Sequence, residues 1–203
     1  GSDPFTLSLC LDKARTKDFL TAHGIPNARY AVIEDEASLS RLLAGEMGSD
    51  SIFSNFPVFL KPVHEGSSKG ITEKNLVRDR DELETQARFL LATYDQPVIA
   101  EEFLPGAEFT CGVLGNGASA QVLPIVGMNF ESLPAGALPI YGYEAKWVWD
   151  TPDEPLDIFE CPARISPALQ RSIEEVVLRA YRILGCRDWS RIDVRLDAGL
   201  GSD

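Results

Sequence analysis

Residues 57–70 read Pro-Val-Phe-Leu-Lys-Pro-Val-His-Glu-Gly-Ser-Ser-Lys-Gly. The apolar start predicts a buried strand that delivers Lys61 to a loop rich in glycine and serine. Such a loop can wrap phosphates, because its backbone N–H groups and the hydroxyls of Ser67 and Ser68 are donors and Lys61 adds a point charge. The order of residues matches neither the P-loop pattern nor the arrangement in protein kinases. Taken alone, the segment fits an ordinary polar turn with an exposed lysine equally well.

Helical and strand signals alternate on both sides of this stretch, which predicts a mixed α/β chain. Asp12 is a suitable N-cap for a helix that ends at Gly24, and Ser166-Pro167 begins the clearest helix, which ends at Gly185. Pro105-Gly106 is a turn signal and a natural hinge between two lobes. The remaining expected elements are helices around 39–43 and from Asp79 to Tyr94, and strands at 30–33, 57–61, 98–103, 108–114 and 191–196.

The last of these strands, 191–196, has an unusual charged face. Its sequence Arg-Ile-Asp-Val-Arg-Leu places Arg191, Asp193 and Arg195 on one side and the apolar residues on the other. A charged face on an otherwise apolar strand requires an explanation. A functional site and a structural ion pair between Arg191 and Asp193 are both consistent with it.

Composition excludes several classes of partner. The net charge of −12, without a cluster of lysine or arginine, argues against a nucleic-acid backbone or an anionic membrane surface. No apolar run of about eighteen residues and no signal-peptide pattern occur, so we expect neither a membrane span nor secretion. The four cysteines lack metal-site spacing and are expected to be reduced thiols that act as small apolar fillers in a cytoplasmic protein. Residues 1–6 resemble a cloning remnant and are left out of the fold.

Several segments occur in an order and spacing that resemble the ATP-grasp domain of the D-alanine–D-alanine ligase family. They are Leu11–Lys17, Phe59–Pro62, Glu65–Ser68, Glu101–Leu104, Gly106–Thr110, Tyr141–Trp147, Cys161–Ala163 and Gly185–Val194. The resemblance extends from Leu11 to Leu196 and depends on the ordered set rather than on any one segment. It implies an α/β (α+β) fold of two lobes with ATP between them, the first at 7–104 and the second at 105–203.

The resemblance also implies a role for individual residues in binding ATP. Lysines would share the phosphate charge, the loop would cover the phosphates, the hinge would hold adenine, and an acidic residue would take the ribose hydroxyls. The expected ATP contacts are Lys13, Lys61, Glu65, Gly66, Ser67, Ser68, Glu101, Glu102, Phe103, Leu104, Glu108 and Lys146. For single residues, solvated strand ends at Glu101 and Glu102 and a surface lysine at Lys146 remain alternatives.

The reaction that the family resemblance implies is phosphoryl transfer from ATP to a carboxylate, followed by attack of an amine on the acyl phosphate. Asp193 is the expected ligand of Mg²⁺, with Mn²⁺ as an alternative ion. Arg191 would stabilise the oxyanion, and Ser67 is the second expected catalytic residue. A small amino acid or carboxylate, with a D-amino acid as the leading guess, would be the substrate.

The chain departs from the family pattern in three places. A preceding domain and a Glu-x-Asn segment after Asp193 are not present, so the chain is expected to be a fragment, a truncated form or the ordered part of a longer protein. Trp147 stands where a tyrosine is common and cannot accept a hydrogen bond, which puts the usual contact with the serine loop in doubt. A nucleotide-binding module without catalysis is therefore the alternative to an enzyme. An open sheet edge would permit a homodimer.

Overall fold

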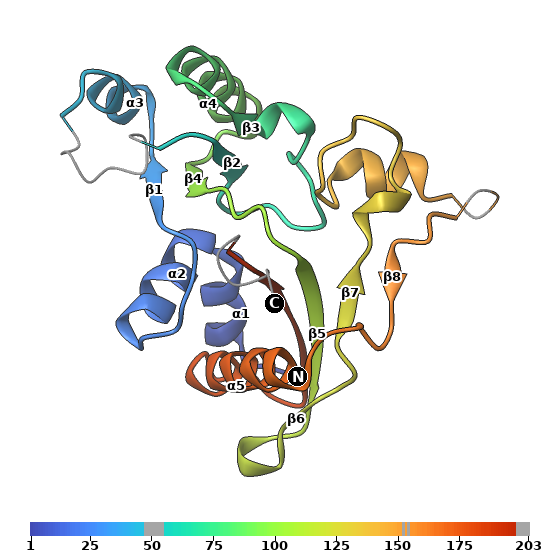
Figure 1. The fold of residues 1–203 in the computed structure, drawn as a ribbon. Coiled ribbons are helices and arrows are strands. Elements are labelled where there is room, and N and C mark those ends of the chain that lie inside the picture. Colours follow the sequence, from blue (N-terminus) through green and yellow to red (C-terminus); the bar gives the residue numbers. More distant parts are fainter. Residues whose placement is uncertain (47–54, 152, 154, 198–203) are drawn as a thin grey trace.

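The computed structural model describes residues 1–46, 55–151, 153 and 155–197, and within them two antiparallel sheets carry most of the fold (Figure 1). The helices are α1 Pro4–Leu11, α2 Lys13–Ala22, α3 Glu36–Leu43, α4 Arg80–Tyr94 and α5 Pro167–Ile183. The strands are β1 Tyr30–Ile33, β2 Val58–Pro62, β3 Leu76–Val77, β4 Val98–Glu102, β5 Glu108–Leu114, β6 Gln121–Val122, β7 Val126–Met128, β8 Phe159–Glu160 and β9 Trp189–Arg195. Short helical segments are η2 Glu73–Asn75, η3 Gly117–Ser119, η4 Phe130–Ser132 and η5 Ala145–Trp149.

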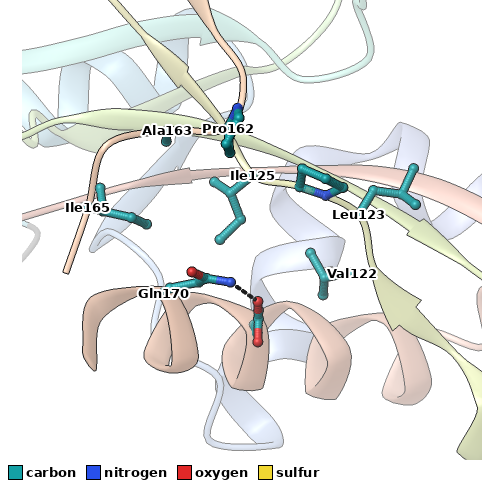
Figure 2. Close-up of a pocket in the computed structure, with 9 residues that line it drawn as sticks. Val122, Leu123, Ile125, Pro162, Ala163, Ile165 and Gln170 are labelled. Atoms are coloured by element: carbon teal, nitrogen blue, oxygen red, sulfur yellow. Dashed lines mark hydrogen bonds between the residues drawn. The ribbon is translucent and has the colours of Figure 1, made fainter. Parts of the chain in front are cut away.

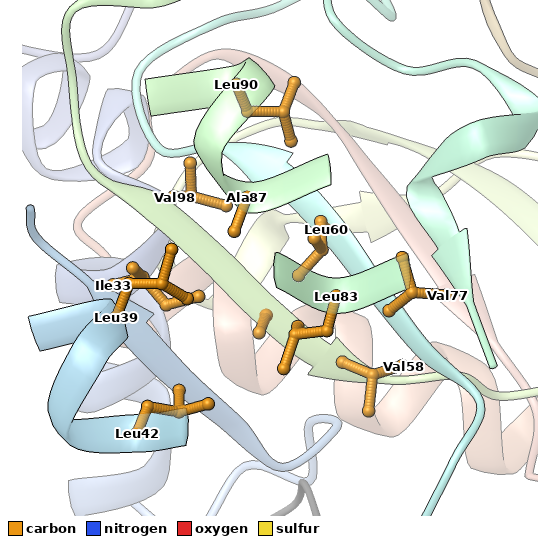
Figure 3. Packing of buried hydrophobic residues seen from close by; sticks show 11 residues of the cluster. Ile33, Leu39, Leu42, Val58, Leu60, Val77, Leu83, Ala87, Leu90 and Val98 are labelled. Carbon is orange, nitrogen blue, oxygen red and sulfur yellow. The ribbon is translucent and has the colours of Figure 1, made fainter. Parts of the chain in front are cut away.

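The first sheet has the order β1-β4-β2-β3 and is antiparallel throughout. Side chains alternate along a strand, so Val58 and Leu60 of β2 and Val98 and Ala100 of β4 share one face. Helices α3 and α4 cover this face, and Leu83 of α4 lies among these strand residues in the buried core (Figure 3). The opposite face of the first sheet is therefore the one available for a site.

The second sheet is built around β5, which pairs with β6 and β7 along one edge and with β9 along the other. Phe109, Cys111 and Val113 of β5 are buried against α5, which contributes Val177 and Tyr181. The alternate residues of β5 therefore lie on the face away from α5. The long ladder with β9 places the charged residues of β9 on that same face.

Most of the elements expected from the sequence are present with their caps. The carboxylate of Asp12 accepts a hydrogen bond from the Arg15 N–H at 2.9 Å, and Asp79 accepts from Glu82 N–H at 2.8 Å. Strand bounds differ slightly: β4 ends at Glu102, one residue before the expected end, and β9 begins two residues earlier than expected. The early start of β9 follows from its pairing with the whole length of β5.

The start of the chain takes part in the fold, and the expectation that all four cysteines are apolar fillers is wrong. Residues 1–6 were left out of the fold, yet Pro4–Leu11 is a helix in which Thr6 is buried and donates to the Leu184 carbonyl at 3.1 Å. Of the four free cysteines, Cys111 is buried as an apolar filler, whereas Cys10 and Cys161 are exposed. No helix in the described part of the chain is long and apolar enough to cross a membrane.

Candidate functional site

Lys61 and Glu101 lie on the face of the first sheet that is turned away from α3 and α4. The Lys61 ammonium donates to one carboxylate oxygen of Glu101, and Lys17 of α2 lies 3.0 Å from the other. Only 8% of Glu101 is exposed. Burial acts to raise the pKa of the Glu101 carboxyl, but the charges of Lys61 and Lys17 outweigh it and lower the pKa to about 2. Glu101 is therefore not a solvated strand end, and at neutral pH its carboxylate is ionised and paired with two lysines.

This lowered pKa gives a prediction for acid stability. A carboxylate whose pKa is depressed on folding contributes stability that is complete above its unfolded pKa, near 4.5, and that disappears as the pH falls through about 2. We expect the difference in free energy of unfolding between the wild type and a Glu101→Gln variant to shrink over this window. Urea unfolding at stepwise pH measures it, and a difference independent of pH would contradict the ion cluster.

Lys13 lies beside this cluster and is tied to the backbone where the loop begins. Its ammonium donates to the carbonyls of Pro62 and Val63 at 3.1 Å each and to the carbonyl of Glu65. Burial, and next the positive charge of Lys61, lower the pKa of Lys13 to about 8. The structure therefore gives Lys13 contacts to the loop that the sequence did not indicate, and it places Lys13 close enough to Lys61 for the two charges to repel.

The Gly-Ser loop touches the segment 138–149 of the second lobe at several points. The Ser68 hydroxyl donates to the Tyr141 carbonyl at 3.0 Å, and the Tyr143 N–H donates to the Ile71 carbonyl at 2.9 Å. The Trp147 indole N–H donates to the Ser67 carbonyl at 3.4 Å. Trp147 thus contacts the loop by a different bond from the serine–tyrosine one, because the indole uses its donor on a backbone acceptor.

The remaining loop and hinge residues have varied surroundings. Glu65 pairs with Lys69 at 3.0 Å inside the loop, next to Gly66. Glu102 forms an exposed ion pair with Arg29 at 2.9 Å. Phe103, which follows Glu102, stacks on Phe59, with 6.4 Å between the ring centroids. The aromatic pair is an apolar surface at the hinge, as an adenine slot requires.

Lys146 lies in η5, a π-helical turn that the sequence did not predict. Its ammonium lies over the Trp147 ring at 5.6 Å from the centroid. A cation over an aromatic ring keeps its charge and its donors, so this position is compatible with a phosphate contact. The structure does not bring Lys146 into contact with the Lys61 and Glu101 pair.

Arg195 organises the hinge and the acidic end of β5. It pairs with Glu108 at 2.7 Å, donates to the Leu104 carbonyl, and its guanidinium carbon lies 5.2 Å from the Phe103 ring centroid. Burial raises the pKa of Glu108, against the attraction of Arg195. The ribose acceptor expected from the sequence and the adenine hinge are therefore held together by one guanidinium.

Asp193 lies opposite Thr110 in the β5–β9 ladder, and the Thr110 hydroxyl donates to its carboxylate. Arg191 pairs with Asp193 at 3.3 Å, and both side chains are more than half exposed. Within the described ranges, no three His, Cys, Asp or Glu side chains come together as a metal-binding group. The donor chemistry of Asp193 suits a hard cation, but Asp193 supplies a single ligand residue.

A hollow of about 360 Å³ lies on the face of the second sheet that packs against α5 (Figure 2). Seven apolar side chains line it, and its polar members Gln170 and Glu174 of α5 are hydrogen-bonded to each other at 2.8 Å. None of the residues expected to contact ATP lines it. This hollow is distinct from the candidate nucleotide site.

Sequence reasoning missed three residues of the candidate site: Lys17, Thr110 and Arg195. Lys17 follows Lys13 by four positions, and this spacing places both on one face of a helix. Arg195 shares the charged side of β9 with Asp193, which was a signal for a contact there. Thr110 gave no signal of its own, because only the β5–β9 register reveals its partner.

A family model, curated sequences and solved structures all relate this chain to ligases of one family. The family model described as "D-ala D-ala ligase C-terminus" matches residues 19–200. D-alanine–D-alanine ligases of Bordetella petrii and Cupriavidus pinatubonensis are 37% and 31% identical, each over 98% of this chain and 54% of the relative. The solved VanG D-Ala:D-Ser ligase of Enterococcus faecalis has a TM-score of 0.71 at 27% identity, covering 98% of this chain and 52% of that one. A Bacillus anthracis D-alanine–D-alanine ligase complexed with ATP, at 20% identity and a TM-score of 0.69, supports the fold alone.

Two antiparallel sheets joined at a hinge, whose faces away from α3, α4 and α5 carry basic side chains and carboxylates, are the architecture of an ATP-grasp protein. The solved relatives share this fold. Within that class, the chain belongs to the D-alanine–D-alanine ligase family and corresponds to its C-terminal part. It spans about half the length of the curated relatives that it matches.

Proposed function

We propose that this chain holds MgATP for a D-alanine–D-alanine ligase-like enzyme that joins a carboxylate to an amine. One observation carries the proposal: Lys13 donates to carbonyls at the start of the Gly-Ser loop, near enough to Lys61 for the charge of Lys61 to lower the pKa of Lys13. Two cations that repel each other beside a donor-rich loop favour an anion between them. A triphosphate supplies such an anion, and family membership agrees with it.

Each part of the nucleotide has a proposed set of contacts. Adenine would lie at the hinge strand end, where Phe59 and Phe103 supply an apolar surface. The ribose would lie by Glu108. The phosphates would lie among the lysines and the loop, whose members are Lys13, Lys61, Lys146, Glu65, Gly66, Ser67 and Ser68. The hinge would be completed by Glu101, Glu102 and Leu104. The Glu101 side chain is paired with Lys61, and the Leu104 carbonyl accepts a hydrogen bond from Arg195.

The proposed reaction has two steps. In the first, a carboxylate oxygen of the substrate attacks the γ-phosphorus of ATP, the bond to the bridging oxygen breaks, and ADP leaves. In the second, an amine attacks the acyl phosphate, phosphate leaves, and the amine loses a proton. The lysines offset the phosphate charge, and Arg191 would stabilise the oxyanion of the second step. Asp193 would hold Mg²⁺ or Mn²⁺, which supplies charge neutralisation at the phosphates.

The substrate pair is proposed from the family: a D-amino acid as the carboxylate and D-alanine as the leading amine. A nucleotide-binding module that is inactive by itself is the second candidate. This second candidate is favoured because, among the described residues, Asp193 does not belong to a group of three potential metal ligands. ADP release by this chain that depends on an added amino acid would exclude that candidate. Dimerisation through a sheet edge stays a prediction for light scattering.

The proposed function predicts nucleotide binding by the chain itself. Calorimetric titration with a non-hydrolysable ATP analogue and Mg²⁺ is expected to show a dissociation constant in the micromolar range, which corresponds to a binding free energy of about −8 kcal/mol. The same titration in the presence of EDTA is the control and should show weaker binding. A folded chain with no heat of binding at millimolar analogue would contradict the proposal.

A further inference from the structure

Glu101 has two ammonium partners, which come from different elements and differ in their access to solvent. Lys61 leaves the end of β2 beside the Gly-Ser loop and its side chain is 28% exposed, whereas the Lys17 side chain on α2 is 12% exposed. The two lysines bind different oxygens of the carboxylate, so either can leave without breaking the contact of the other.

Lys17 is fixed in place by further contacts. Its ammonium donates to the Ala28 carbonyl at 2.9 Å and lies 3.4 Å from the Asn27 side-chain oxygen. It also lies 5.3 Å from the centroid of the Tyr30 ring. These contacts hold Lys17 beside Glu101, whereas Lys61 is the partner of Glu101 that lies next to the Gly-Ser loop.

Under the proposed function, Lys61 must leave Glu101, at least in part, to bind a phosphate oxygen. A buried carboxylate that loses its sole cation becomes an uncompensated charge, and this cost would oppose nucleotide binding. With Lys17 in place, Glu101 keeps one charged partner after Lys61 turns away.

We propose that Lys17 is a positioning residue for nucleotide binding: it stays paired with Glu101 while Lys61 exchanges that carboxylate for a phosphate. The inference rests on the proposed function and adds a residue that contacts no part of the nucleotide. Lys17 keeps Glu101 ionised, so the Glu101 carboxylate can pair with Lys61 again when the phosphate leaves.

The charged and titratable groups around Glu101 support this assignment. Lys61 on β2 and Lys17 on α2 pair with it directly, and the charge of Glu101 acts to raise the pKa of Lys13 on α2. From β1, Tyr30 lies opposite Glu101 in the strand register, and its hydroxyl donates to Asp18 rather than to Glu101. Among these groups, Lys17 is the cation that stays paired with the Glu101 carboxylate when Lys61 leaves.

The first test needs no nucleotide. Carbon-detected NMR titration of the Glu101 carboxyl in a Lys61→Met variant mimics the departure of Lys61. We expect Glu101 to remain ionised at pH 7 in this variant, and its pKa to rise by at least about 2 units when Lys17→Met is added. Lys17→Arg on the same background should keep the pKa low. A rise of less than about 0.5 units in the double variant would overturn the inference.

The second test uses calorimetry with the ATP analogue, Mg²⁺ and the Lys17→Met single variant, which retains Lys61. We expect binding at least about 10-fold weaker than wild type and proton uptake at pH 7, seen as a heat that depends on the buffer. Lys17→Arg should restore both, and Lys74→Met, which removes an exposed charge, should change neither. Wild-type affinity without proton uptake would overturn the inference. A wild-type chain that fails to bind would instead contradict the proposed function, while the NMR titration still decides the role of Lys17.

Discussion

Replacing Glu101 with alanine is expected to lower the free energy of unfolding by about 3–5 kcal/mol at pH 7. The substitution removes the buried anion that Lys17 and Lys61 share and leaves two ammonium groups near each other without compensation. Lys13, whose pKa already reflects repulsion from Lys61, would add to the strain. Urea unfolding followed by circular dichroism measures the change.

The neighbouring residue supplies a matched control for this prediction. Glu102 belongs to the same strand and also pairs with a cation, Arg29, but at an exposed position. Exposed ion pairs contribute about 0–1 kcal/mol, so Glu102→Ala should have a small effect. Equal losses for the two variants would show that the buried cluster has no special importance.

Replacing Lys61 with alanine is expected to weaken binding of the MgATP analogue at least about 100-fold, or about 2.7 kcal/mol. Lys61 is the half-buried cation at the start of the Gly-Ser loop, and its loss would remove the proposed charged contact to phosphate. Stability should change less than in Glu101→Ala, because Lys17 remains paired with the carboxylate. Calorimetric titration of the folded variant measures the affinity.

Lys74→Ala is the control for charge alone. Lys74 lies in η2, so its removal alters net charge by the same amount without touching the Glu101 cluster. Its affinity for the analogue should stay within about twofold of wild type. If Lys61→Ala binds as well as Lys74→Ala does, Lys61 is not a phosphate ligand and the proposed orientation of the nucleotide is wrong.

The helices and strands followed from local sequence because their signals are local. Asp12, Asp79 and Ser166 each cap the helix that they were expected to begin, since an N-cap depends on atoms a few residues away. Tertiary contacts decided the exceptions. Residues 4–6 join α1 because Thr6 finds a buried acceptor 178 positions away.

The candidate site residues were proposed from the sequence through an ordered set of motifs that resembles one family, and they stay a prediction. What each side chain contacts was not readable from the sequence. Glu101 was expected at the adenine hinge, and the structure buries its carboxylate between Lys17 and Lys61. Trp147 was expected to put the usual serine–tyrosine contact in doubt, and in the structure its indole donates to the Ser67 carbonyl.

The sequence by itself determined the fold class and the alternation that gives the strand around Asp193 a charged face, and it proposed the lysines, acids and Gly-Ser loop as site residues. Only the tertiary structure decided which of these charges meet. The physical reason is that ion pairing depends on strand register and on burial, which bring together groups far apart in the chain. Glu108 and Arg195 are paired across 87 positions by the β5–β9 ladder, and no local pattern encodes that register.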